Sequence, residues 1–444
     1  MMPPMRSFLF LQGPIGPFFK QLSDALKARG HHVHKVNFWG GDEAFFPDGE
    51  SFTDPAANWP THLLSLCRKH MVTDIVLFGD RRSYHEDAIE SIAEANPDTR
   101  VWVFEEGYFR PNWITLDHYG VNARSSLPSS REELIAAAEG IETLPTPSQH
   151  SVTPWVREFL PSLGKYHAVA KALAGKYPHF QYHRMKPPLT ELSGWMKTLA
   201  GRAIGHSEEG DIDDFRALET TDHFLAPLQL EGDFQIRKYS PFKGNAEFIN
   251  FLIASFAKHA DGSRALVIKS HPYDCRWAHW RSHTYRIAKQ FGVADRVVFV
   301  HKCPVSEIVE NCRGCVTINS SFGLDALTRG IPVKALGQAF WNFAPITNEG
   351  TLDRFWSAPE KPAPEAVNLM KEVVMRRTQF NGGFYSEQGR ALCIQDVANT
   401  LSSREQSTSV LSEAPTMRLQ EKRARRVHEL GSTQARKKKL DLFI

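Results

Sequence analysis

Short apolar runs alternate with stretches of helical periodicity at both ends of the chain. The run 7–11 leads into a glycine-containing turn, and from Phe18 apolar residues recur at helical spacing until Gly30, which suits the end of a helix. Further apolar runs predict strands at 33–38, 74–78, 101–104, 265–269, 297–300, 316–318 and from Gly330 onward. Because strands that alternate with helices pair in parallel, the pattern predicts an α/β protein whose sheets are covered on both faces.

The region from about 126 to 215 interrupts this alternation. Its predicted helices, 165–176 and 191–203, carry aromatic residues interleaved with basic ones. The alternation resumes near 225, with a helix over 245–260. After about 402 the composition becomes polar and then basic, which predicts no stable structure. The predicted organisation is an α/β domain at 1–125, a basic, partly helical insertion at 126–224, a second α/β domain at 225–402 and a basic, disordered tail at 403–444.

Charge is distributed unevenly along the 444 residues, although 53 basic and 50 acidic residues leave a net charge of only +3. Segment 151–205 holds eight Lys/Arg and two Asp/Glu, and segment 417–444 holds nine and three, so each has a net charge of +6. The remaining residues hold 36 basic and 45 acidic side chains, a net charge of −9. An acidic body therefore carries two basic regions, whose purpose the rest of the sequence must explain.

The N-terminal residues 1–19 do not resemble a secretory signal, and no apolar run reaches the ~18 residues that span a bilayer. We therefore expect a cytoplasmic protein. Its six cysteines do not form a disulfide framework. His301, Cys303, Cys312 and Cys315 would need to converge to bind zinc, and we favour the alternative that Cys312 and Cys315 flank the start of a buried strand. We predict no metal site, and the sequence contains no Asp-x-Asp signature in a suitable loop.

Two motifs at predicted strand ends suggest a phosphate site. Asn319-Ser320-Ser321-x-Gly323 joins a strand to a helix, whose free N–H groups point beyond the strand end. Lys269-Ser270-His271-Pro272 follows another strand, and parallel sheets bind ligands at this edge. The alternatives are an ordinary serine cap and an ordinary loop histidine. Taken together, the two motifs predict a clamp for a phosphodiester.

Two pairs of carboxylates lie in a predicted turn and at a predicted strand end. Glu231 and Asp233 lie in a turn where the second α/β unit begins, and Glu105 and Glu106 follow the strand at 101–104. Adjacent carboxylates at a sheet edge, as Glu105 and Glu106 would be, are candidates for acid–base chemistry if neighbours or burial shift a pKa. The alternatives are an acidic surface turn and solvated glutamates. The Gly13–Pro17 turn lacks the G-x-G-x-x-G spacing, so it does not predict a dinucleotide site.

The motifs taken together resemble the capsular polysaccharide export and biosynthesis proteins, the bacterial capsule β-Kdo transferases. The resemblance covers about residues 7–400 and is nearest to the single-module type that starts the Kdo linker. The motifs that carry it are Leu11-Gln12-Gly13-Pro14-Ile15-Gly16-Pro17-Phe18-Phe19, Asn37-Phe38-Trp39-Gly40-Gly41-Asp42, Glu105-Glu106-Gly107-Tyr108 with Arg110-Pro111, Pro227-Leu228-Gln229, Lys269-x-His271-Pro272, Asn319-Ser320-Ser321-x-Gly323-Leu324-x-Ala326-Leu327 and Gly330-x-Pro332-Val333.

The resemblance implies a GT-B-like architecture, in which two Rossmann-like domains face a cleft. It implies a first, acceptor-side domain, whose loop residues are Gln12, Gly13, Gly16 and Asp42. It implies a second domain that binds the CMP part of CMP-Kdo through Lys269, Ser270, His271, Pro272, Asn319, Ser320, Ser321 and Gly323. CMP is a monophosphate leaving group, which one cationic clamp can stabilise without a metal cofactor.

The same resemblance implies a retaining reaction. Asp233 is the implied nucleophile, with Glu231 as the alternative, and Glu105 or Glu106 is implied to activate the acceptor hydroxyl. His271 is counted with the catalytic residues. Lys269, Arg237 or Lys238 is expected to face the carboxylate of Kdo.

The implied partners are lysophosphatidylglycerol as acceptor, the longer two-module Kdo transferase and the capsule export machinery. Basic segments 165–202 and 418–439 are candidates for contact with the anionic inner face of the cytoplasmic membrane. A solvated helical insertion is the alternative for the first of them. No nucleic-acid-binding module is visible. Two rival functions remain, a non-enzymatic export or scaffold protein and a related enzyme that uses another nucleotide sugar.

Overall fold

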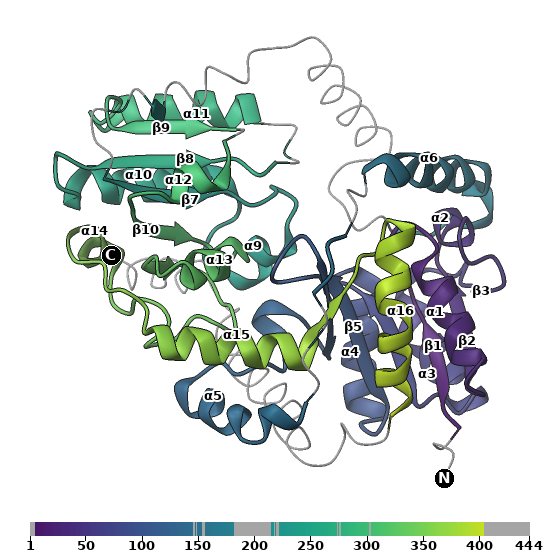
Figure 1. The fold of residues 1–444 in the computed structure, drawn as a ribbon. Helices are drawn as coiled ribbons and strands as arrows, with labels where there is room; N and C mark the ends of the chain where they lie inside the picture. The colour runs from purple at the N-terminus through teal and green to yellow at the C-terminus, as the bar shows by residue number, and fades with distance from the viewer. Residues whose placement is uncertain are drawn as a thin grey trace. The chain divides into compact units, whose positions relative to one another are not determined.

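The computed structural model describes residues 5–144, 147, 149–152, 156–181, 215–216, 218, 222–272, 274, 277–301 and 303–403. The chain divides into two compact units (Figure 1). The first comprises the described parts of 1–127, 140–183 and 373–425, and the second comprises the described parts of 128–139 and 184–372. These units differ from the predicted domain ranges chiefly because residues 373–403 join the first unit rather than the second.

The first unit contains a seven-stranded mixed sheet and its covering helices. Its strands are β1 (Ser7–Phe10), β2 (His32–Asn37), β3 (Glu50–Ser51), β4 (Asp74–Phe78), β5 (Arg100–Glu106), β6 (Trp113–His118) and β12 (Gln379–Asn381). Its helices are α1 (Phe18–Lys27), α2 (Gly40–Glu43), α3 (Trp59–Lys69), α4 (Ser83–Ala95), α6 (Val156–Ala172) and α16 (Glu387–Ser402). Short 3₁₀ helices lie at Ala56–Asn58, Asn122–Arg124, Ile141–Thr143 and Ala174–Lys176.

The strand order in this sheet is β12-β6-β5-β4-β1-β2-β3. From β5 to β3 the strands are parallel, whereas β6 and β12 pair antiparallel at one edge. The chain builds outward from β1 through β2 to β3 and then returns to the other side of β1 at β4. The point where the strand order reverses, between β1 and β4, is where sheets of this kind bind ligands.

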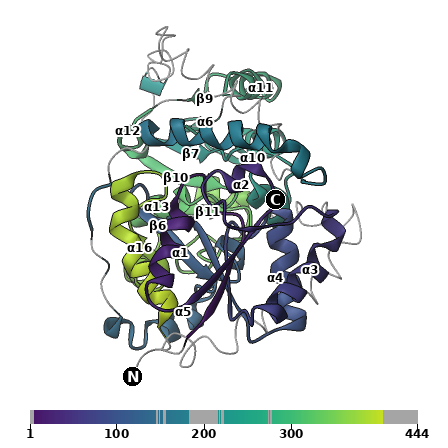
Figure 2. The same cartoon turned by 90° about the vertical axis from the view of Figure 1, so that its right-hand side faces the viewer.

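Alternation along β1 explains how the sheet is covered. Phe8 and Phe10 pack on one face against residues of α1 and α16, and Leu9 packs on the other face against residues of α3 and α4. Because successive strand residues point to opposite faces, four apolar residues in a row serve two separate cores. Helices α1 and α16 lie side by side although they are far apart in the sequence (Figures 1 and 2).

A buried polar cluster fastens α16 to the start of the sheet. Asp74 is fully buried and accepts hydrogen bonds from the Arg6 guanidinium and, at 2.8 Å, from the Trp102 indole nitrogen. Arg6 also donates to the carbonyl oxygen of Leu401 at the end of α16. This attachment explains why the C-terminal helix belongs to the first unit.

The second unit contains a five-stranded sheet, all parallel, in the order β11-β10-β7-β8-β9. The strands are β7 (His223–Pro227), β8 (Ala265–Lys269), β9 (Val297–Val300), β10 (Cys312–Thr317) and β11 (Val333–Ala335). The helices are α5 (Arg131–Ala138), α9 (Phe234–Tyr239), α10 (Asn245–His259), α11 (Trp277–Gln290), α12 (Val305–Val309), α13 (Phe322–Thr328) and α14 (Leu352–Ser357), and α15 (Pro364–Thr378) leads the chain into the first unit.

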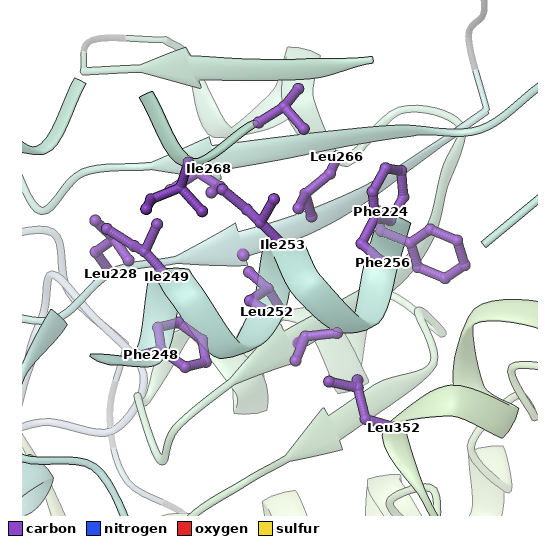
Figure 3. Packing of buried hydrophobic residues seen from close by; sticks show 14 of the residues in the cluster. Phe224, Leu228, Phe248, Ile249, Leu252, Ile253, Phe256, Leu266, Ile268 and Leu352 are labelled. Atoms are coloured by element: carbon purple, nitrogen blue, oxygen red, sulfur yellow. The ribbon is translucent and has the colours of Figure 1, made fainter. Parts of the chain in front are cut away.

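Helix α10 supplies much of the core on one face of this sheet. Its apolar residues, among them Phe248, Leu252 and Phe256, are fully buried against residues of β7 and β8 (Figure 3). Leu225 and Val267 point to the other face and form a second cluster that includes Ile308 of α12. The parallel order confirms the predicted α/β class in this half of the chain.

Several predicted elements match the structure, and others fall outside it. The strands predicted at 74–78, 265–269 and 297–300 are β4, β8 and β9. The helix predicted at 165–176 belongs to the longer α6, which ends at Ala172, and the following 3₁₀ helix. The helix predicted at 191–203 and the tail from 404 lie outside the described residues. In the part of the chain that is described, no helix has both the length and the apolar composition to cross a membrane.

Candidate functional site

The C-terminal ends of four neighbouring strands bring the predicted site residues of the second unit to one edge of its sheet. Asp233 follows β7, Ser270 and His271 follow β8, His301 follows β9, and Asn319 follows β10. The strand order reverses between β7 and β10, so the loops after these two strands flank the switch point where α/β sheets bind ligands.

Gln229 connects the loops on either side of this switch point. Its side-chain nitrogen Nε2 donates to Oδ2 of Asp233 at 3.1 Å and to Oδ1 of Asn319 at 3.0 Å. Its oxygen Oε1 accepts a hydrogen bond from the Asn319 backbone N–H at 3.3 Å. Asn319 in turn donates from Nδ2 to the carbonyl oxygens of Gln235 and Gln338. The two loops therefore form one hydrogen-bonded assembly.

Asp233 and Glu231 are both anchored at the beginnings of helices. Oδ1 of Asp233 accepts from the backbone N–H of Gln235 at 2.8 Å and thereby caps α9. Oε2 of Glu231 accepts from the backbone N–H of Asn245 at 3.0 Å, where α10 begins. A side chain on Gly244 would lie 2.6 Å from Oε1 of Glu231, so the glycine leaves space for that carboxylate. A carboxylate has about four lone-pair sites, so a capping role leaves Asp233 able to act as a nucleophile.

Lys269 is a buried cation at the end of β8, only 7% exposed. Its Nζ donates to the carbonyl oxygen of His301 at 3.4 Å, and among the described residues it forms no ion pair with a carboxylate. Burial lowers the pKa of Lys269. A buried ammonium group without a counter-ion is costly, and an anionic ligand would remove that cost.

Ser270 and His271 continue from Lys269 along the same edge. The Ser270 hydroxyl lies 2.6 Å from Nδ1 of His301, a residue that the sequence analysis considered only as a zinc ligand. The main chain of His271 turns at this point, because its carbonyl oxygen accepts from the Asp274 N–H at 2.9 Å. Pro272 is exposed. The structure therefore groups Lys269, Ser270 and His301, with His271 following directly.

The Asn319-Ser320-Ser321-x-Gly323 motif joins β10 to α13. Oγ of Ser320 accepts from the Phe322 N–H at 3.2 Å, whereas the side chain of Ser321, at the N-cap position of α13, makes no capping bond. Gly323 has a packing role, because a Cβ there would lie 2.5 Å from Cη2 of the fully buried Trp341. The motif thus combines a capped helix start with a close approach of backbone to tryptophan.

In the first unit, Gln12 and Asp42 form a related arrangement beyond β1 and β2. Nε2 of Gln12 lies 3.2 Å and 3.3 Å from the two carboxylate oxygens of Asp42, which also accepts from the Phe38 N–H at 3.0 Å. Burial raises the pKa of Asp42. Burial lowers the pKa of the neighbouring Lys35 to about 8, although the negative charge of Asp42 acts to raise it.

The loop glycines near this arrangement are required by packing. A Cβ on Gly13 would lie 2.7 Å from the Phe19 ring, and Gly16 has a φ of +127°, which favours glycine. A Cβ on Gly40 would lie 2.8 Å from the Val169 carbonyl oxygen of α6. The glycine pair before Asp42 therefore seats α6, where Tyr166 accepts a hydrogen bond from the Trp39 indole at 3.1 Å.

Glu105 at the end of β5 has a pKa well above the ordinary value of a glutamate. The pKa of Glu105 is raised to about 7, chiefly by burial. The hydrogen bond from the Glu106 N–H lowers it, the negative charge of Glu106 raises it, and Arg110 and Arg82 lower it. Oε1 of Glu105 accepts from the Glu106 N–H at 3.0 Å. A carboxyl group that titrates near neutral pH at a sheet edge is suited to general acid–base chemistry.

Arg82 lies at the same edge, beyond β4. It donates to the Gly13 carbonyl oxygen at 3.2 Å, and its guanidinium lies 5.1 Å from the centre of the Phe78 ring. In the second unit, Arg237, a candidate for the Kdo carboxylate, lies 4.7 Å from the centre of the Phe234 ring on α9. Lys238, the third residue considered for the Kdo carboxylate, is exposed on the same helix.

The cysteines of β10 follow the structural alternative. Cys312 and Cys315 both lie in this strand, whose pairing with β7 shifts in register between Cys312 and Gly314, and Cys315 is fully buried. Among the described residues, Cys303, Cys312 and Cys315 form no disulfide bond. Within the described residues, no group of three or more His, Cys, Asp or Glu side chains is arranged to hold a metal ion.

Sequence reasoning missed the roles of Gln229, His301 and Arg82. Gln229 entered only as part of a motif, His301 only as a possible metal ligand, and Arg82 not at all. Each lies within a few residues of a strand end. That position was the available signal, but their partners lie up to 90 residues away.

These features define an α/β protein with two parallel-rich sheets that each carry polar and ionisable groups at a strand-end switch point. The chain belongs to the capsule polysaccharide biosynthesis protein family, which matches residues 73–385.

Two relatives support this assignment. The chain is 34% identical to the capsule polysaccharide modification protein LipB of Neisseria meningitidis over 393 residues, which cover 86% of this chain and 92% of that protein. It is 29% identical to the capsule polysaccharide export protein KpsS of Escherichia coli over 384 residues, 86% of this chain and 97% of that protein. A solved KpsC β-Kdo 2,7 transferase of Thermosulfurimonas dismutans is 14% identical, covers 89% of this chain and 99% of its own, and has a TM-score of 0.41, too low to assign an activity.

Proposed function

We propose that the protein is a retaining glycosyltransferase of the GT-B type that moves β-Kdo from CMP-Kdo to lysophosphatidylglycerol and so starts the linker of a capsular polysaccharide. The observation that carries the proposal is Lys269, a buried ammonium group at a ligand-binding sheet edge without a carboxylate partner among the described residues. A CMP phosphate, or the carboxylate of Kdo, would supply the missing negative charge.

The second unit is assigned to the donor. Lys269, Ser270, His271 and Pro272 after β8, with Asn319, Ser320, Ser321 and Gly323 after β10, are proposed to surround CMP. Arg237 and Lys238 remain candidates for the Kdo carboxylate. No metal is required for a monophosphate leaving group in this assignment, because the cation Lys269 is already at the edge of the sheet.

The reaction is assigned to two displacements. A carboxylate oxygen of Asp233 attacks the anomeric carbon of Kdo, and the bond from that carbon to the CMP phosphate breaks, with its electron pair leaving on CMP. The acceptor hydroxyl then attacks the same carbon and releases Asp233, while Glu105 or Glu106 takes the hydroxyl proton. Glu231 remains the alternative nucleophile. Two inversions at one carbon retain the configuration.

The first unit is assigned to the acceptor, with Gln12, Gly13, Gly16 and Asp42 shaping the loops beside Glu105. A phospholipid acceptor would place the enzyme at the cytoplasmic face of the inner membrane. The basic segments 165–202 and 418–439 are proposed to contact that surface, and only the part of the first segment up to 181 lies in the described structure. The longer two-module transferase and the export machinery are the proposed partners.

The test is to incubate the purified protein with CMP-Kdo and lysophosphatidylglycerol and to analyse the lipid by mass spectrometry. We expect the mass of one Kdo to be added, and we expect Asp233→Ala to abolish the addition while Glu231→Ala retains it. Replacing CMP-Kdo with UDP-sugars or CMP-sialic acid tests the rival donors. A protein that transfers no sugar from any of these donors, yet still supports capsule export as Asp233→Ala, would be a non-enzymatic export protein.

A further inference from the structure

We infer that Gln229 is a positioning residue that holds the nucleophile Asp233 in register with the loop that binds the leaving group, an inference that rests on the proposed function. Gln229 lies in the loop after β7 and is 6% exposed. Its amide contacts both Asp233 and Asn319, which come from the two loops that flank the switch point.

The orientation of the Gln229 amide is determined by its partners. Nε2 faces two oxygens, Oδ2 of Asp233 and Oδ1 of Asn319, and Oε1 faces the Asn319 backbone N–H. If the amide were reversed, Oε1 would face two oxygens and Nε2 would face an N–H group. Only the observed orientation pairs each donor with an acceptor, so the side chain has a single satisfied arrangement.

The main chain of Gln229 is held as firmly as its side chain. Its carbonyl oxygen accepts from Nδ2 of the fully buried Asn245 at 2.8 Å, at the start of α10. The remaining oxygen of Asp233, Oδ1, is fixed by the Gln235 N–H at 2.8 Å. Gln229 thus completes a frame in which the Asp233 carboxylate is attached on one side to α9 and on the other to the Asn319 loop.

This frame couples donor binding to the attack. The Asn319-Ser320-Ser321 loop is assigned to the CMP phosphate, and the carbon that Asp233 attacks is one bond away from the phosphate oxygen. A shift of the Asp233 loop relative to the phosphate loop changes the distance from nucleophile to anomeric carbon, and a misplacement of about 1 Å can cost about 100-fold in rate. Gln229 bridges those two loops directly, through one side-chain amide.

The test compares Gln229→Met, which keeps the size of the side chain and removes its hydrogen bonds, with Gln229→Glu, which places oxygen atoms opposite Asp233 and Asn319. The control is Gln290→Met, the same change at an exposed glutamine at the end of α11. Single-turnover mixing with CMP-Kdo measures the rate constant and the amplitude of CMP release separately. Calorimetry measures the affinity for CMP alone.

We expect Gln229→Met to lower the rate constant about 100-fold, with the amplitude and the affinity for CMP within about threefold of the wild type. Gln229→Glu should be at least as slow, and Gln290→Met should match the wild type. If Gln229 only supported the fold, Gln229→Met would lower the amplitude and leave the rate constant unchanged. If it only filled space, Gln229→Glu would react at the wild-type rate. Either result overturns the inference and leaves the proposed function standing.

Failure of the proposed function would look different. The wild-type protein would then neither bind CMP nor release it from CMP-Kdo, before any variant is compared, and the inference would fall with it. If Gln229→Met does not fold, the rate constant and amplitude of Gln229→Glu, in which an oxygen replaces the amide nitrogen, are compared with those of the wild type instead.

Discussion

Replacement of Glu105 by glutamine should make the protein more stable and less active, and the stability effect should depend on pH. Burial raises the pKa of Glu105 from 4.5 to about 7. The folded protein therefore holds this proton more tightly than the unfolded chain does. Below about pH 4.5 both states are protonated and the group has no effect on stability. Between about pH 4.5 and 7 the unfolded chain ionises first, and the folded state loses stability as the pH rises.

The magnitude follows from the two pKa values. A pKa that rises from 4.5 to about 7 corresponds to at most about 3 kcal/mol above pH 7, at about 1.4 kcal/mol for each tenfold change in proton affinity. Glu105→Gln should therefore raise the free energy of unfolding at pH 8 by up to about 3 kcal/mol and leave it nearly unchanged at pH 4.5. Urea unfolding at the two pH values measures the difference. Equal effects at both pH values would refute the raised pKa of Glu105.

The same pKa predicts how activity depends on pH. If ionised Glu105 takes the acceptor proton, the fraction of active enzyme rises about tenfold from pH 6 to pH 8. If Glu105 is the base, removing a neighbouring charge should shift the pH at which activity rises. Glu106→Gln should shift it to lower pH, because the Glu106 charge raises the pKa of Glu105, and Arg110→Gln should shift it to higher pH, because Arg110 lowers that pKa. Loss of all activity in Glu106→Gln, with activity retained in Glu105→Gln, would assign the role to Glu106 instead.

Three further predictions concern buried groups. Asp74→Asn should lower the free energy of unfolding in urea by about 3–5 kcal/mol, because it leaves the buried Arg6 without its counter-ion. The control, Asp24→Asn in the exposed pair with Lys20, should lower it by about 1 kcal/mol or less. Gly323→Ala should lower the free energy of unfolding in urea by about 1–3 kcal/mol, because the added Cβ would clash with Trp341. The control, Gly164→Ala within α6, where a Cβ meets nothing within 4 Å, should leave that free energy unchanged or raise it. Lys269→Met should raise the melting temperature of the ligand-free protein and weaken CMP binding at least about tenfold. A lower melting temperature would contradict the view that Lys269 has no counter-ion among the described residues.

Local pattern predicted those strands that are continuous apolar runs. Strands β8 and β9 match their predicted ranges residue for residue, because every residue in each is buried and a turn or charge bounds the run. Strand β12, Gln379–Asn381, has no such pattern, and its strand conformation comes from pairing with β6 more than 260 residues earlier in the chain. The position of α16 likewise depends on Arg6 and His31 near the N-terminus, and no local signal in residues 387–402 indicates that attachment.

The candidate site was predictable to the level of the strand end and no further. Parallel topology brings Lys269 and Ser320 to one edge once their strands are recognised. The contacts among these loops depend on side-chain pairs that are distant in sequence, such as Ser270 with His301 and Gln229 with Asn319. That Lys269 has no carboxylate partner among the described residues could be recognised only when the packed surroundings were known.

Both units place a glutamine after their first strand and bond it to an aspartate, but the surroundings of the two aspartates differ. Asp42 accepts hydrogen bonds from Gln12 and from the Phe38 N–H, and burial raises its pKa. The two glycines before it pack directly against α6. That aspartate closes a loop on which a helix is seated. Asp233 is bonded instead to Gln229, whose amide reaches the neighbouring Asn319 loop, beside a row of strand ends that includes a buried lysine. The same glutamine–aspartate contact thus closes a loop in the first unit, whereas in the second it joins the Asp233 loop to the Asn319 loop, which is proposed to bind the donor.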